Sequence, residues 1–178
     1  MKIVFLLIVM FGLVVMTAPS SYASTYGSGK YNAVVPYGGQ TNLTISTSGN
    51  IAIPITPGST PTLGTASGTV TVVSTDAVGY KLYIRALSSA NMTSGANTIP
   101  ASVNGTAAAL ATNTWGYNLD GTTNFVGMTT SDVLIRTGTG PFGSGDVTTV
   151  TYGVRIDQAK AAGSYTTTVI YTAVPQTT

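Results

Sequence analysis

The sequence predicts an all-β sandwich of about nine or ten strands, and three observations agree on it. Apolar and polar residues alternate along most of the chain after residue 40, which is the pattern of half-buried strands. Thr, Val, Ile and Tyr, which favour the pleated surface of a sheet, are abundant. Gly, Pro and Asn recur at short intervals as turn signals, and no segment has a convincing helical period. We therefore expect a single domain with immunoglobulin-like topology.

Four segments show the alternation most clearly. Residues 80–86 and 150–156 place apolar side chains at every second position, with Lys81, Arg85 and Arg155 on the other face. Residues 51–55 carry three alternating isoleucines, and residues 165–174 form the last predicted strand. In each case the apolar face is predicted to face the core.

Two of the turns are predicted from dipeptides in which Gly follows Asn or Asp. Asn104 and Gly105 suit the two positive-φ positions of a type I′ hairpin, which would place Ile99 opposite Leu110. Asp120-Gly121 is a second signal of the same kind, and residues 159–163 are expected to connect the last two strands.

Residues 1–23 are predicted to be a secretory signal peptide, cleaved after Ala23. Lys2 precedes an apolar run over residues 3–16, and Ser21-Tyr22-Ala23 gives a small-x-small ending. The run is short of the roughly 20 residues that span a bilayer, although a retained membrane anchor is the alternative. Residues 24–39 then form an N-terminal extension and residues 40–178 the sandwich domain. No membrane span is expected after cleavage.

The composition argues against an enzyme. The chain has no His, no Cys and no Glu, and only 7% of its residues are charged. No Ser-His-Asp triad, Cys-His dyad or ordinary zinc site can be built, so we predict no catalytic residue, metal or cofactor. A net charge of +2 offers no footprint for nucleic acid. Residues 138–143 match G-x-G-x-x-G, but a strand pattern follows where a nucleotide site needs a helix.

The N-terminal extension contains a candidate donor strand. Tyr31, Ala33, Val35 and Tyr37 would share one side of an extended strand, and Pro36 restricts it to an edge or an added position. If this strand completes the sheet of the next copy, a head-to-tail filament results. The alternative is that it forms the first strand of its own sandwich.

A ligand-binding face is the second functional hypothesis. Trp115 and Tyr117 alternate on one predicted strand and would stack on sugars if exposed, although the core is the usual place for a single Trp. Asn42, Asn91 and Asn104 begin N-x-[ST] triplets and are candidate glycosylation sites. Surface glycans would be the partner of such an adhesin or carbohydrate-binding module.

Three blocks of sequence carry a family resemblance. Residues 162–171 fit the pattern A-G-x-Y-x-x-x-V, and residues 79–84 and 114–119 have a similar character. These strands resemble those of exported bacterial and archaeal β-sandwich surface proteins, including fimbrial-type pilins. The resemblance implies a pilin-like fold and a structural role outside the cell. We therefore expect a secreted, self-assembling subunit of a cell-surface filament, with copies of itself as partners.

Overall fold

The computed structural model describes residues 8–11, 42–75 and 77–176, and these residues form strands, turns and loops. The described part of the chain contains no helix, so none that could cross a membrane. The strands are β1 (Ile8–Phe11), β2 (Asn42–Thr47), β3 (Ile51–Ala52), β4 (Thr62–Thr75), β5 (Gly79–Ala86), β6 (Met92–Ser94), β7 (Asn97–Ile99), β8 (Thr114–Asn118), β9 (Val133–Thr139), β10 (Phe142–Ile156) and β11 (Thr166–Gln176).

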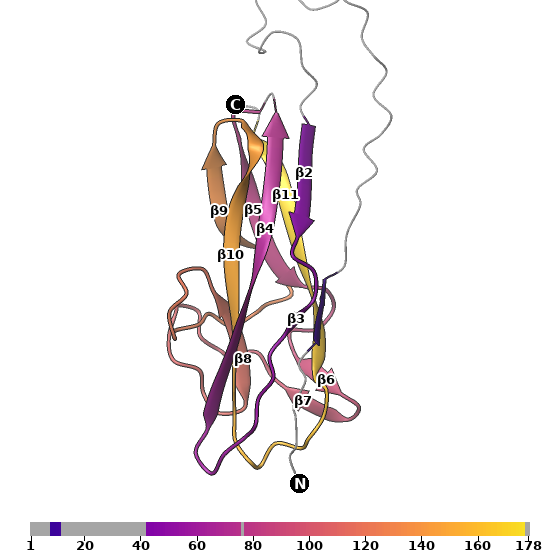
Figure 1. Cartoon of the computed structure of the whole chain (residues 1–178), viewed down its shortest axis with the longest axis vertical. Helices are drawn as coiled ribbons and strands as arrows, with labels where there is room; N and C mark the ends of the chain where they lie inside the picture. The colour runs from indigo at the N-terminus through magenta and orange to yellow at the C-terminus, as the bar shows by residue number, and fades with distance from the viewer. Residues whose placement is uncertain (1–7, 12–41, 76, 177–178) are drawn as a thin grey trace, which may run out of the picture.

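The strands form two packed sheets, which confirms the predicted β-sandwich (Figure 1). One sheet has four strands in the order β2-β4-β10-β8, and all its neighbours are antiparallel. The other sheet has seven strands. Its main path is β3-β1-β11-β5-β9, and the β6–β7 hairpin joins it through β11. The β1–β11 pair is parallel, whereas the other pairs of this sheet are antiparallel.

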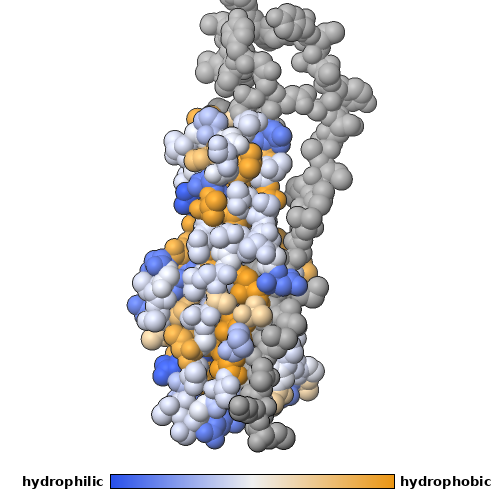
Figure 2. Space-filling model, in the orientation of Figure 1, coloured by the Kyte–Doolittle hydropathy of each residue, from blue (hydrophilic) through white to orange (hydrophobic). Residues whose placement is uncertain are grey.

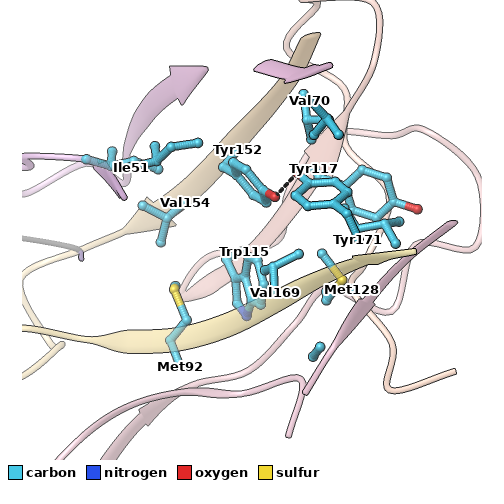
Figure 3. Packing of buried hydrophobic residues seen from close by; sticks show 14 of the residues in the cluster. Ile51, Val70, Met92, Trp115, Tyr117, Met128, Tyr152, Val154, Val169 and Tyr171 are labelled. Atoms are coloured by element: carbon cyan, nitrogen blue, oxygen red, sulfur yellow. Dashed lines mark hydrogen bonds between the residues drawn. The ribbon is translucent and has the colours of Figure 1, made fainter. Parts of the chain in front are cut away.

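The core lies between the two sheets and follows the predicted alternation. Each of the residues predicted to face inward on β5 and on the second half of β10 is buried, and so are the three alternating isoleucines near β3. Long aromatic side chains fill much of the space, as Figure 3 shows. The buried residues of these three segments are Tyr80, Leu82, Ile84, Ala86, Val150, Tyr152, Val154, Ile156, Ile51, Ile53 and Ile55.

The predicted hairpin at Asn104-Gly105 is wrong. The hairpin in this region joins β6 to β7, so Met92 pairs with Ile99, and Leu110 does not. Asn104 instead uses its side-chain amide to donate hydrogen bonds to the carbonyls of Ala108, Ala109 and Phe125. These bonds join the loop that contains Asn104 to the loop that contains Phe125. They override the preference of Asn104-Gly105 for a type I′ turn.

The other two predicted connections lie where expected, although the turn type at Asp120-Gly121 differs. Gly121 has a φ of 68° and its N–H donates to the side-chain oxygen of Asn118, but Asp120 has no positive φ, so the turn is not type I′. Residues 157–165 link β10 to β11 without regular structure. Residues 138–143 span the tight turn between β9 and β10, where Gly140 has a φ of 102°. These two strands lie in different sheets, so the glycine-rich match is a turn from one sheet to the other.

The face of β10 that points away from the main core, where Arg155 was predicted, is partly covered. Gly153 is buried, because the loop after β8 folds back and places the ring of Phe125 over it. A Cβ at this position would collide with that ring. The absence of a side chain at Gly153 therefore allows the ring of Phe125 to pack against β10 on the face opposite the main core.

Candidate functional site

The most unusual feature of the fold is how β3 is held in its sheet. Among the described strands, β3 pairs with β1 and with no other. Ile51 lies opposite Val9, and Ala52 lies opposite Ile8. On its other edge β1 pairs with residues 166–169 of β11. We call the strand position between β3 and β11 the acceptor slot, because β1 is the strand that fills it here.

Side-chain packing also anchors the chain around β3. Ile51, Ile53 and Ile55 lie over β4, at two glycines where a Cβ would overlap the isoleucine side chains. These glycines are Gly64 and Gly68. Side-chain packing therefore fixes the wall of the slot on one side, while the backbone groups along its edge need a strand in the slot as partner.

The other wall of the slot is a central strand. Val169 of β11 pairs with Ala86 of β5 on the far edge, and Thr166 pairs with Thr93 of β6. Val169 is completely buried, so its side chain faces the core. Because paired neighbours in a sheet share a face, any strand in the slot turns the residues opposite Thr167 and Val169 toward the core. The slot thus selects apolar residues at alternate positions.

The strand that fills the slot belongs to the predicted leader. β1 covers residues 8–11, inside the apolar run that the sequence assigns to a signal peptide. The candidate donor residues Tyr31, Ala33, Val35 and Tyr37 lie outside the described residues. Sequence reasoning missed the slot, since the run at residues 3–16 fits a leader and a strand equally well.

Trp115 and Tyr117 do not form a ligand face, and that prediction is wrong for these residues. Trp115 is 1% exposed and Tyr117 is 3% exposed, and both lie in the core between the sheets (Figure 3). The indole N–H of Trp115 donates a 2.8 Å hydrogen bond to the carbonyl of Ala90. The indole is therefore both packed and hydrogen-bonded, which leaves no surface for stacking on a sugar.

The three candidate glycosylation sites have different surroundings. Asn42 and Asn91 are exposed, at the start of β2 and just before β6. The amide nitrogen of Asn104, to which a glycan would be attached, donates to three backbone carbonyls. A glycan at Asn104 would have to break these bonds, so Asn42 and Asn91 remain the accessible positions of the three.

Two buried tyrosines join the sheets across the core. The hydroxyls of Tyr152 on β10 and Tyr171 on β11 lie 2.5 Å apart and share a hydrogen bond, drawn as a dashed line in Figure 3. Burial raises the pKa of both phenols, that of Tyr152 well above its usual value. Both side chains must therefore stay protonated in the folded protein.

We expect these tyrosines to make the protein sensitive to alkali. Their contribution is fully present below the unfolded-state pKa of about 10, and it is lost as pH rises toward the raised pKa of the folded state. The loss can reach about 1.4 kcal/mol per pH unit for each tyrosine. Urea unfolding at pH 8 and pH 11 should show a shallower decline for the Tyr152→Phe, Tyr171→Phe double variant than for the unaltered chain. Equal declines would contradict this assignment.

A charged cluster ties three strands together near the β9–β10 turn. Asp146 accepts hydrogen bonds from the hydroxyl of Tyr80 and, at 2.8 and 2.6 Å, from the guanidinium of Arg136. Burial alone would raise the pKa of Asp146, but these bonds lower it by more, so the net shift is downward. The carboxylate of Asp146 is thus paired with the guanidinium of Arg136 inside the cluster. The described residues contain no group of acidic side chains that would hold a metal ion.

No protein-family model, no curated protein and no solved structure matches this chain. The acceptor slot is therefore the feature of the described structure from which function has to be argued.

Proposed function

We propose that the protein is an exported structural subunit that assembles with copies of itself into a pilus-like filament at the cell surface, by donation of a strand between subunits. The observation that supports this most directly is that β3 is paired only with β1 among the described strands. If residues 1–23 are removed on export, the slot is left without its strand. The exposed edges of β3 and β11 then need a new partner.

The N-terminal extension has the pattern that the slot selects. Ala33 and Val35 alternate in the same way as the core-facing positions opposite Thr167 and Val169. Tyr31 and Tyr37 continue the alternation on either side. A strand added to a sheet edge gains backbone hydrogen bonds along its length and specificity from alternate side chains.

The reach of the chain favours the extension of a neighbouring copy. Asn42 lies at the end of the sandwich where Gln176 lies, as Figure 1 shows for the start of β2. The upper end of the slot, Val169, is about 23 Å from that end along β11, and the two sheets lie about 10 Å apart. Together these two separations give a straight-line distance of about 25 Å. With Val35 opposite Val169, the seven residues to Asn42 reach at most about 25 Å when fully extended. A subunit's own extension therefore has no slack to fill the slot in this register.

The surface suits contacts between copies. The face seen in Figure 2 is mostly weakly polar, with separate apolar patches and few strongly hydrophilic residues. Only 7% of the residues of the chain are charged. Packing such surfaces together requires few charges to be removed from water, which would otherwise oppose association.

A matched pair of charge substitutions tests this function. Val35→Asp places a carboxylate at a core-facing slot position and should abolish filaments, because burying an unpaired charge is costly. Val34→Asp adds the same charge on the opposite face of the strand and should leave assembly intact. Electron microscopy and sedimentation of the two variants, purified as chains that start at residue 24, measure the difference.

Two results would count against the proposal. If the unaltered chain from residue 24 remains a monomer at high concentration, self-assembly is wrong. If filaments form equally with both variants, the filament is held by something other than the predicted donor strand.

A further inference from the structure

The leader segment itself occupies the slot, and this contact carries an inference about how assembly is controlled. Val9 pairs with Thr167 on one edge and with Ile51 on the other, so it bridges both walls. We propose that the uncleaved leader is an intramolecular blocker, which fills the acceptor slot of its own chain until cleavage after Ala23 opens it. This rests on the proposed function, because it names what controls access to the same slot.

The length of the intervening chain allows the leader to bind in its own subunit. Residues 12–41 connect β1 to the start of β2, and a chain of that length reaches far more than the distance it has to cover. For the extension at residues 31–37, the chain that leads to Asn42 is just long enough, with no slack, when Val35 lies opposite Val169. The leader can therefore close the slot within one chain, whereas in that register the donor strand fits between chains.

Because the leader is covalently attached to its own slot, it competes for the slot better than a donor strand from another copy. A segment tethered to its own slot acts at an effective concentration in the millimolar range. A donor strand from another copy at micromolar concentration is about a thousandfold more dilute. Residues 8–11 contain no proline, so each of their N–H groups is able to donate, whereas Pro36 removes one donor from the extension. Cleavage ends the tether, and the leader then loses this advantage.

The test uses the full chain with a specific-protease site inserted directly after Ala23. The chain has no cysteine, so Ile8→Cys and Ala52→Cys introduce one defined pair at positions that face each other in register. Before cleavage, oxidation should give a cross-link within one chain, seen as a faster-migrating monomer on a non-reducing gel. Without cross-linking, the uncleaved chain should stay monomeric and form filaments only after the protease is added.

A pair of proline variants shows whether the β1 pairing is the block. Val9→Pro removes an N–H in the middle of the strand and should let the uncleaved chain assemble. Val14→Pro makes the same change in the same apolar run but beyond β1, and should leave the uncleaved chain monomeric. Sedimentation rates and filament counts compare the two.

The outcomes separate this inference from the proposed function. If the cleaved chain forms filaments but the uncleaved chain does so at the same rate, or if the cross-link forms only between chains, the blocker is wrong and the filament stands. If the cross-link forms within one chain but cleaved protein never assembles, the filament proposal is overturned, and with it the control of assembly.

Discussion

A chain that begins at residue 40 is expected to unfold about 10–20 °C below the full chain. It lacks both the leader strand and the candidate donor strand, so nothing of its own fills the slot between β3 and β11. An empty slot forgoes the burial of two or three apolar side chains, which is worth roughly 5 kcal/mol. For a domain of this size each kcal/mol lowers the melting temperature by about 2–4 °C. Circular dichroism melts of the two chains, both kept dilute, measure the difference.

A peptide added to the shortened chain is the sharper part of this experiment. A synthetic peptide of residues 31–37 should raise the melting temperature by about 5–10 °C when present at a hundred times its dissociation constant. The same peptide with Val35→Asp should have no effect, and the one with Val34→Asp should retain the effect. A shortened chain as stable as the full chain, with no response to any peptide, would show that the slot needs no strand.

Truncation of Trp115 is expected to be the most damaging single substitution in the core. Trp115→Ala should lower the free energy of unfolding by about 3–5 kcal/mol, because it opens a large cavity. It also leaves the carbonyl of Ala90 without the indole donor. Denaturant unfolding followed by circular dichroism is the suitable measurement, since Trp115 is the chain's single tryptophan and its fluorescence is lost in the variant.

An exposed position supplies the control for Trp115. Val103 is 98% exposed, and Val103→Ala should change stability by no more than about 0.5 kcal/mol. If Trp115→Ala proved as mild as Val103→Ala, the indole would lie on the surface in solution. The sugar-stacking face, which the sequence offered as the alternative, would then have to be reconsidered.

The strands and the inward faces were predictable because their signal is local. In β5 and the second half of β10 every second residue is apolar, and each of these alternating residues is buried. The order of strands in the sheets was not predictable, because periodicity says which face is buried and nothing about which strand lies beside it. Asn104 shows how a long-range contact changes a local prediction, since its amide holds the carbonyl of Phe125, far along the chain.

Of the two parts of the candidate site, the donor strand could be predicted from the sequence and the acceptor slot could not. Tyr31, Ala33, Val35 and Tyr37 could be proposed as a donor strand from their alternation and from Pro36. The acceptor could not, because it is made by the backbone edges of β3 and β11, which no residue type marks. The residue type of Trp115 likewise allowed its side chain to lie either in the core or on the surface, and the tertiary fold places it in the core.

The direction of the slot has a mechanical consequence. β11 runs along the long axis of the sandwich, and the strand in the slot is parallel to it (Figure 1). When a fibre built through this slot is stretched, the pull acts along the inserted strand, so its hydrogen bonds are loaded together in shear. They do not open one after another, as they would if the strand were peeled from one end. A fibre joined in this way resists tension with no covalent link between its subunits.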